Sequence, residues 1–333
     1  KTQSKISLIS AIISGTVGIT MAYKGVGVWA LVVQTLLNAL LVTCLFFYYI
    51  NWRPLKVFSK KSFQGLFSFG SKLLFSRLIH TLYYNLYAIV IGRRYSSAEL
   101  GYYTRAEQLA IFPSSNINAI ISRVTFPILS SIQDDDKRLA LVYRKYIRLA
   151  SFLIFPLMIG LASVAEPLVS FLLTDKWLGT VLLLQILCLD WMLDHLSQIN
   201  LNLLLIKGRS DLSLRLEIVK KIIATLILII SIPYGIEIMC WGRVLYSVLA
   251  TYMNSYYTNR LIGLSLKTQL RDIFPSLLLA AGMGITVYYS ISLFSSDLLK
   301  IIGGVVIGVV FYVMASVILR IGEFKELSLI IKK

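Results

Sequence analysis

Polar side chains that interrupt the long apolar runs of this chain are the residues best suited to chemistry. In the run at 68–92, four of them recur at steps of 3, 4 and 3 residues: Arg77, His80, Tyr84 and Tyr87. That spacing places all four on one face of a helix. A guanidinium donates a planar pair of hydrogen bonds to phosphate oxygens, and tyrosine rings can cover sugar faces. We therefore expect a binding stripe here, unless Arg77 reaches instead to an interface.

A second stripe lies in the run at 100–131. It consists of Arg105, Gln108, Ser115, Asn118 and Ser122, with Asn116 and Arg123 on a neighbouring face. Charged groups at membrane depth are costly and usually face a cavity, so we take Arg105, Gln108, Asn118 and Arg123 as candidate substrate-binding residues. Arg105 and Arg123 stand near opposite ends of the run. An interface role suits each of them equally well, and Arg123 could also act as a gate.

The run at 180–206 contains two carboxylates, Asp190 and Asp194, one helical turn apart. Adjacent carboxylates in a low dielectric repel each other, which suits the uptake of a proton or a cation. We therefore take them as ion-coupling candidates. The alternatives are that they lie at the outer end of the helix or pair with an arginine. Glu166, beside Pro167, is interpreted as a helix end and not as an ion site.

The composition shows what kind of protein must position these residues. Of 333 residues, 57% are hydrophobic and only 15% are charged, against roughly 25% charged in soluble domains. A single soluble core could not bury so much apolar surface. The net charge of +17 would suggest nucleic acid in a soluble protein, but the basic residues lie between apolar runs, as expected for loops that face anionic lipid. The three cysteines show no metal spacing. We predict an all-α integral membrane protein without a metal or cofactor.

About ten apolar stretches are long enough to cross a bilayer as helices. They lie at 6–23, 26–50, 68–92, 100–131, 144–174, 180–206, 213–232, 235–257, 274–295 and 299–320. The fourth and fifth exceed one crossing. We expect these two to protrude from the membrane or to kink, and Pro113, Pro127 and Pro156 are the candidate positions.

The basic residues have a strong side preference. Of the 33, we count 23 on one set of alternate loops and five on the other set. The remaining five lie within helices: Lys72, Arg77, Arg105, Arg123 and Arg243. This pattern obeys the positive-inside rule. It predicts a multi-pass protein of the plasma membrane with both ends of the chain in the cytoplasm.

Residues 5–35 and 215–245 align without gaps at an offset of 210, and Gly25 matches Gly235. Each copy is a predicted helix, a short turn and a second helix. Four predicted helices stand directly before the second copy and none before the first, so we expect four helices to be missing ahead of Lys1. The expected organisation has four parts: the last two helices of an N-terminal bundle (1–51), an amphipathic cytoplasmic connector (52–64), a six-helix C-terminal bundle (65–260), and a terminal helix pair with a cytoplasmic tail (261–333).

Several short motifs carry a family resemblance. They are Phe67–Lys72 (FSFGSK), Gly101–Ala106 (GYYTRA), Arg123–Pro127 (RVTFP), Leu129–Gln133 (LSSIQ), Phe155–Met158 (FPLM), Ala165–Pro167 (AEP) and Lys207–Ser210 (KGRS). The chain resembles the lipopolysaccharide and colanic-acid exporter branch of the Wzx-type polysaccharide flippases, which belong to the multidrug/oligosaccharidyl-lipid/polysaccharide exporter superfamily. The resemblance implies 14 helices in two bundles, arranged as an inverted V around a central cavity.

The resemblance also implies a function. A Wzx-type flippase translocates undecaprenyl-pyrophosphate-linked oligosaccharide repeat units across the bacterial inner membrane for lipopolysaccharide, capsule or exopolysaccharide synthesis, and alternating access is the expected mechanism. A polysaccharide polymerase and a chain-length regulator are possible partners, with no nucleic acid. Two alternatives remain: a cation-coupled drug antiporter of the same superfamily, or a membrane polysaccharide polymerase. The predicted outward loops are short and carry no Walker A loop, zinc-helix motif or nucleophile elbow, so we expect no enzyme.

Overall fold

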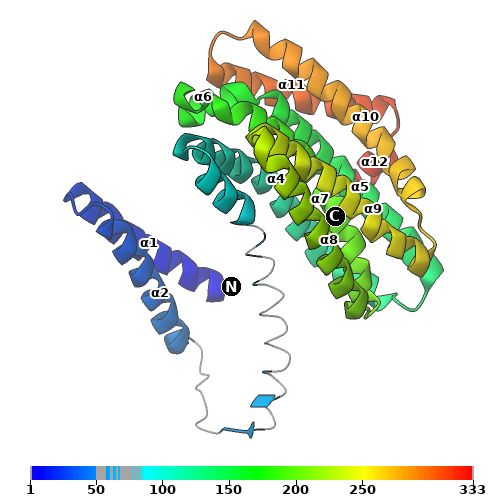
Figure 1. The fold of residues 1–333 in the computed structure, drawn as a ribbon, viewed down its shortest axis with the longest axis horizontal. Helices are drawn as coiled ribbons and strands as arrows, with labels where there is room; N and C mark the ends of the chain where they lie inside the picture. Colours follow the sequence, from blue (N-terminus) through cyan, green and yellow to red (C-terminus); the bar gives the residue numbers. More distant parts are fainter. Residues whose placement is uncertain are drawn as a thin grey trace. The chain divides into compact units, whose positions relative to one another are not determined.

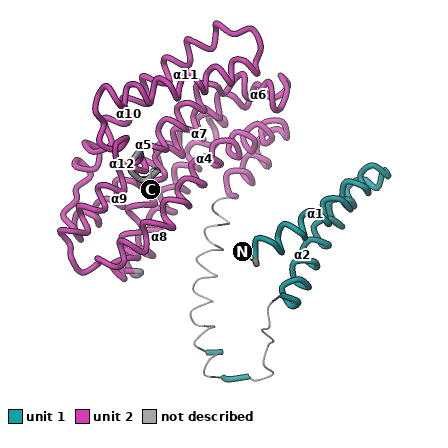
Figure 2. The backbone as a smooth tube through the Cα atoms, turned by 180° about the vertical axis from the view of Figure 1, so that it is seen from behind, with its two compact units in different colours: residues 1–77 teal, residues 78–333 magenta. Residues whose placement is uncertain are grey.

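The computed structural model describes residues 2–49, 58–60, 63, 64, 67, 78, 81, 83 and 85–331. The chain divides into two compact units, residues 1–77 and residues 78–333 (Figure 2). Every regular element in the described part is helical, which confirms the predicted all-α class. Arg77, His80 and Tyr84 of the first predicted stripe lie outside the described residues, as does most of the predicted connector at 52–64.

The first unit contains a helical hairpin. Helix α1 (Thr2–Tyr23) packs on α2 (Trp29–Tyr49) (Figure 1). Gly25 and Gly27 in the turn have φ angles of 77° and 62°, a left-handed conformation that glycine adopts without a Cβ clash. Gly235, which the repeat matches to Gly25, also has a positive φ, 97°, between two antiparallel helices. The two copies of the repeat therefore share a helix–turn–helix form.

The second unit is a bundle centred on one long helix. Its α-helices are α4 (Ser97–Ser131), α5 (Asp136–Ser163), α6 (Ala165–Leu173), α7 (Gly179–Ile206), α8 (Ser210–Ser231), α9 (Ile236–Ile262), α10 (Leu266–Ser290), α11 (Asp297–Ile318) and α12 (Gly322–Ile331), with a helical segment at 85–94 before them. Three short 3₁₀ turns follow α6, α8 and α10: η1 (Asp175–Trp177), η2 (Ile232–Tyr234) and η3 (Ile291–Leu293). Helix α7 packs against α4, α5, α8 and α9, while α10 lies between α5 and α11 (Figure 1).

Local sequence explains where these helices begin and end. Ser96 caps α4 in a capping box, in which the Ser96 side chain accepts from the Glu99 amide and Glu99 accepts from the Ser96 amide. Asp135 and Ser265 cap α5 and α10, where each side chain accepts from a backbone amide of the first turn. Gly263 ends α9 in a left-handed conformation, φ 69°. Polar caps at the ends of apolar helices satisfy the backbone amides that the helix leaves free.

The fifth predicted run is divided, but not at the proline. Helix α5 continues through Pro156 and ends at Ser163, and α6 begins at Ala165. Helix α4 also continues through Pro113 and Pro127 as one element of 35 residues. The break follows Val164, because Glu166 and Pro167 favour the first turn of a new helix. The interpretation of Glu166 as a helix-end residue is confirmed.

Six helices in the described part are long and apolar enough to cross a membrane: α1, α2, α5, α7, α10 and α11. Helices α4, α8 and α9 have the length, but charged residues in each lower the mean hydropathy. Helix α11 presents Val305, Val306 and Val309 with 54–58% of each residue exposed. A wide apolar surface of this kind suits a lipid environment. The chain is a multi-pass membrane protein.

Buried polar groups along α7 pair with neighbouring helices. Thr258 Oγ1 on α9 donates to Asn200 Oδ1 on α7 at 2.7 Å, and Asn200 Nδ2 donates to Gln269 Oε1 on α10 at 2.9 Å. Nearer the middle of α7, His195 Nε2 lies 2.9 Å from Ser151 Oγ on α5. An unpaired polar group is costly in an apolar interior, so these bonds fix the register of α7 against three helices.

Candidate functional site

Arg243 on α9 is a largely buried arginine inside the second unit, and it pairs with two carboxylates. Arg243 follows the first residue of α9 by seven positions, roughly 10 Å along the helix axis, and its side chain is 13% exposed. The guanidinium donates to Asp190 Oδ2 from Nε at 2.9 Å, and Nη2 lies 2.7 Å from the same oxygen. Nη1 donates to Glu107 Oε1 at 2.7 Å and to the Tyr103 hydroxyl at 2.6 Å. One arginine thus connects α9 to both α4 and α7.

Further groups complete the surroundings of this arginine. Ser247 Oγ, one turn along α9, donates to Asp190 Oδ1. The rings of Tyr87 and Trp191 have centroids 5.5 Å and 5.8 Å from Arg243 Cζ, within the range of a cation–π contact. We name Arg243, Asp190, Glu107, Tyr103 and Ser247 the Arg243 cluster.

Helical spacing explains why these residues meet. Tyr103 and Glu107 stand four residues apart on α4, and Arg243 and Ser247 stand four apart on α9, so each pair shares one helix face. Both helices pack against α7, which supplies Asp190. The cluster therefore depends on three helices that are distant in the sequence, with Tyr87 from segment 85–94 as a fourth contributor.

The charges of the Arg243 cluster do not balance. One guanidinium faces two carboxylates, Asp190 and Glu107, so the fully ionised cluster carries one negative charge in excess. An unbalanced charge in a low-dielectric interior is costly. The arrangement therefore concentrates negative charge around Arg243. No group of three or more metal-ligating residues occurs in the part of the chain that the structure describes.

A second polar layer lies on the same side of α7, one turn further on. Lys221 Nζ on α8 stands 4.0 Å above the ring centroid of Tyr83, and the Tyr83 ring lies 6.5 Å from that of Tyr246 on α9. Lys220 is 4% exposed and donates to Glu217, and it interacts electrostatically with Asp194. Tyrosine, lysine and carboxylate thus extend the polar interior beyond the Arg243 cluster.

The position of these two lysines corrects the sequence analysis, in which Lys220 and Lys221 are two of the 23 basic residues counted on one set of alternate loops. Both lie near the middle of α8 (Ser210–Ser231), and Lys220 stands roughly 15 Å from its first residue. The pairing of Lys220 with Glu217 and the ring contact of Lys221 explain why the helix tolerates them there. The side preference of the other basic residues stays a prediction.

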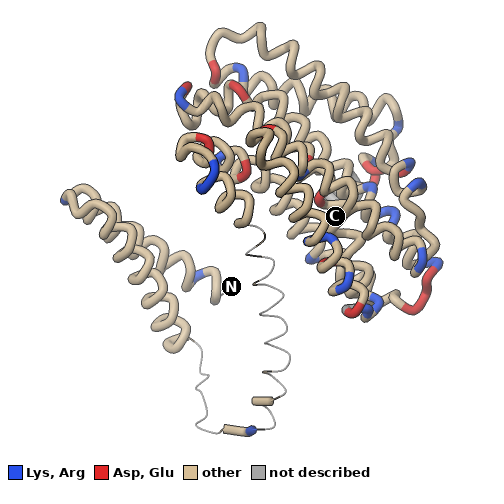
Figure 3. The backbone as a smooth tube through the Cα atoms, in the orientation of Figure 1, with Lys and Arg blue, Asp and Glu red and all other residues tan. Residues whose placement is uncertain are grey.

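The second predicted stripe occupies the exposed face of α4. Arg105 Nη1 donates to Gln108 Oε1 at 2.9 Å, and the guanidinium lies 5.8 Å from the Trp177 ring centroid. Arg105, Gln108 and Arg123 are exposed and Asn118 is partly buried. Figure 3 shows that basic residues gather mainly near the helix ends, with tan stretches between them. A polar stripe on an otherwise apolar helix suits a water-filled space better than lipid.

The predicted residues thus divide into groups. Tyr87 and Asp190 meet at the Arg243 cluster, and the pairing of Asp190 with an arginine is one of the alternatives that the sequence left open. Asp194 belongs to the second layer. The sequence analysis missed Tyr103, Glu107 and Ser247. A signal for Glu107 existed: an arginine inside an apolar run requires a buried acid as a partner.

Apolar helices around buried, paired charges define a polytopic membrane protein. The chain belongs to the polysaccharide biosynthesis protein family, which it matches over residues 1–182. It is 30% identical over 239 residues to the teichuronic acid biosynthesis protein TuaB of Bacillus subtilis (strain 168), covering 72% of this chain and 50% of that protein. It is also 30% identical over 225 residues to the lipopolysaccharide biosynthesis protein WzxC of Escherichia coli (strain K12), covering 65% of this chain and 45% of that protein. The chain spans about half the length of these curated relatives.

The fold has a solved counterpart. Lipid II flippase MurJ, in an inward closed conformation, superposes with a TM-score of 0.72 over 96% of this chain and 67% of that one, at 17% sequence identity. At that identity the likeness concerns the fold alone. The family and the flippase-type fold expected from the sequence motifs are both confirmed.

Proposed function

We propose that this chain is part of a flippase that moves undecaprenyl-pyrophosphate-linked oligosaccharide repeat units from the inner to the outer leaflet of the bacterial inner membrane. Family membership and the MurJ-like fold support a lipid-linked saccharide as cargo. The observation that carries the proposal is the polar interior of the second unit. Paired charges in the interior of a bundle contribute little net stability, because apolar residues would pack there at less cost, so a functional role is favoured for them.

The anionic headgroup of such a cargo requires cations and flat rings. Arg105 and Arg123 on the exposed face of α4 offer guanidinium groups to phosphate oxygens, and Gln108 and Asn118 add hydrogen bonds to sugar hydroxyls. Arg77, His80 and Tyr84 of the first predicted stripe are proposed as further headgroup contacts, whereas Tyr87, the fourth member, is buried beside Arg243. The polyprenyl tail stays in the bilayer while the headgroup crosses.

The Arg243 cluster is proposed as the coupling element. In its ionised form, Asp190 and Glu107 hold α7 and α4 to Arg243 on α9. Binding of the coupling ion at one carboxylate would weaken the bond of that carboxylate to the guanidinium and let the helices separate. Alternating access needs such a bistable contact. Asp194, in the neighbouring polar layer, is a second candidate for the same role.

The proposal includes the orientation of the chain in the membrane and its place in the intact protein. With the basic loops inside, both termini of the chain face the cytoplasm. Residues 1–51 would be the last two helices of an N-terminal bundle, 65–260 a C-terminal bundle and 261–333 a terminal pair. A polysaccharide polymerase and a chain-length regulator would act on the delivered units. The chain itself would transport and not catalyse.

Deleting the gene tests the proposal. Loss of flipping should raise the pool of lipid-linked repeat units, measured by mass spectrometry of extracted lipids, and lower surface glycan. Restoring the wild-type gene should reverse both effects. Restoring an Arg105→Ala variant should do so only partly, whereas Lys300→Ala, which removes a partly buried lysine paired with Asp297, serves as the matched control. A changed drug tolerance with normal surface glycan would favour the antiporter and contradict the proposal.

A further inference from the structure

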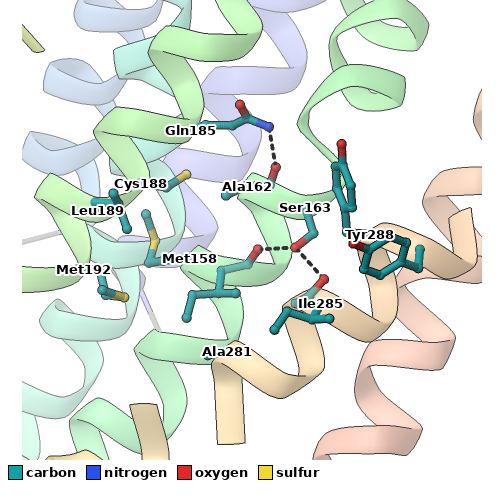
Figure 4. A pocket seen from close by; sticks show the side chains of 13 residues that line it. Met158, Ala162, Ser163, Gln185, Cys188, Leu189, Met192, Ala281, Ile285 and Tyr288 are labelled. Carbon is teal, nitrogen blue, oxygen red and sulfur yellow. Dashed lines mark hydrogen bonds between the residues drawn. The ribbon is translucent and has the colours of Figure 1, made fainter. Parts of the chain in front are cut away.

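A pocket of about 500 Å³ lies between α5, α7 and α10 (Figure 4). Its lining includes Met158, Ala162, Ser163, Gln185, Met192 and Ala281. The pocket belongs to a different side of α7 from the Arg243 cluster, because α5 and α10 form its walls while α4 and α9 hold the cluster. The proposed transport function therefore makes no use of it.

The pocket has a polar end and an apolar end. Ser163 is the last residue of α5, and Tyr288 and Tyr289 stand in the last turn of α10, so these residues mark the end of the bundle. Met192 lies deeper, seven residues beyond Gln185 on α7, roughly 10 Å along the axis. That depth is about a third of the ~30 Å hydrocarbon core. Tyrosines at such a boundary are typical of the membrane interface.

Two polar side chains of the pocket, Gln185 and Ser163, already donate to backbone carbonyls. Gln185 Nε2 donates to the Ala162 carbonyl at 3.2 Å. Ser163 Oγ donates to the Ile159 carbonyl at 2.9 Å and to the Gly284 carbonyl at 3.2 Å (Figure 4). A stable buried water needs two to four polar partners, and the deeper walls offer methionine, leucine and alanine instead. The pocket therefore suits an apolar occupant.

Small residues create this space, and the surrounding surface faces lipid. Gly284 brings α10 close to α5, since a Cβ there would stand 2.4 Å from Ile159 Cγ2. Ala162 and Ala281 leave room beside that contact. Leu278 and Ile285 on the same helix are 56% and 61% exposed, so the pocket opens on an apolar surface that the bilayer covers.

We propose that this pocket holds one acyl chain of a bilayer phospholipid, with its headgroup at the Ser163 and Tyr288 end. A methylene group fills roughly the volume of a water molecule, about 30 Å³, so the pocket accommodates about one ordinary acyl chain. An undecaprenyl chain has several times more carbon atoms, which argues for the phospholipid. The bound chain would fill the gap between α5, α7 and α10 and stabilise their packing.

Photocrosslinking tests the proposal. The chain is reconstituted in nanodiscs whose phosphatidylethanolamine carries a diazirine in one acyl chain, and adducts are mapped by mass spectrometry after irradiation and digestion. We expect adducts to concentrate in 158–163, 185–192 and 281–289. Ala281→Trp fills the pocket and should lower the adduct yield about tenfold, as for a tenfold loss of affinity. Val309→Trp, on the exposed apolar face of α11 and outside the pocket lining, should leave the yield unchanged.

Other outcomes overturn the proposal. Adducts spread evenly over all exposed apolar helix faces would show ordinary solvation by lipid. Displacement of the probe by a small mole fraction of undecaprenyl phosphate would assign the pocket to a polyprenyl chain, and covalent dimers would assign it to a second copy. If Ala281→Trp does not fold, Ala162→Leu fills the pocket from its opposite wall. If neither variant folds, the distribution of adducts in the wild type decides. Because the map requires no transport, its failure is distinct from failure of the flippase proposal.

Discussion

Removing Arg243 should reveal how much the charge cluster stabilises the bundle. Arg243→Met keeps a similar volume but leaves Asp190 and Glu107 facing each other without a counter-charge. Asp190 loses contacts to Nε and Nη2 at 2.9 Å and 2.7 Å, and Glu107 loses one to Nη1 at 2.7 Å. Breaking a buried pair by removing one partner costs about 3–5 kcal/mol. At roughly 2–4 °C per kcal/mol for a unit of this size, Tm should fall by about 10 °C.

The matching neutral variant separates charge from packing. In the triple variant Arg243→Met, Asp190→Asn and Glu107→Gln, no ionised group remains in the cluster. Replacing a whole buried ion network by neutral residues of similar volume is often nearly neutral in stability. The triple variant should therefore recover most of the Tm that the single variant loses, even though it contains more substitutions.

The single carboxylate variants should differ in a defined order. Glu107→Gln leaves Arg243 paired with Asp190, which also accepts from Ser247, so the charges then balance. Asp190→Asn removes the acid that makes more contacts with the guanidinium, so it should destabilise the fold more than Glu107→Gln does. A hydrogen bond to a charged group contributes about 1.5–3 kcal/mol. Thermal unfolding in detergent, followed by intrinsic fluorescence, measures all four variants. A Tm for Arg243→Met within 2 °C of the wild type, or a triple variant less stable than the single one, would refute this reasoning.

Two further predictions concern packing and the α12 contact. Gly284→Ala should destabilise the fold by about 1–2 kcal/mol, because the added Cβ would stand 2.4 Å from Ile159 Cγ2. Gly15→Ala is the control: a Cβ there has nothing within 4 Å, so this variant should be neutral or stabilising. Equal Tm shifts for the two variants would contradict the packing argument. Arg148→Glu should lower Tm by about 2–4 °C, because Arg148 Nε lies 3.0 Å from Glu323 Oε1 on α12. Adding Glu323→Arg should restore at least half of that loss, and an unchanged Tm in both variants would show that α12 is not held by this pair.

The sequence alone predicted most of the helices and their character. Apolar runs of about 20 residues located the described spans, because a lipid environment leaves few other stable structures for such runs. Capping residues such as Ser96 and Asp135 mark the helix starts that the structure shows. The fifth predicted run was not divided in the prediction, whereas the structure ends α5 at Ser163 and begins α6 at Ala165; the kink predicted at Pro156 stays a prediction.

The site was harder to predict because it depends on contacts between helices. Asp190 and Asp194 were recognised as intramembrane acids, yet their partners come from α9 and α8, which the sequence cannot place beside α7. Glu107 was overlooked for the same reason, since only the approach of α4 to α9 gives it Arg243 as a partner. Lys220 was counted with the loop residues because the sequence does not show that it pairs with Glu217 within α8.

The leaflet that holds the lipid-linked oligosaccharide tests the central claim most directly. In spheroplasts treated with a membrane-impermeant oxidant of sugar diols, repeat units on the outer leaflet react and those on the inner leaflet are protected. We predict that wild-type cells present reactive lipid-linked units and that cells lacking the gene accumulate protected ones. If the reactive fraction is the same in both strains, this chain does not move the lipid-linked unit across the membrane.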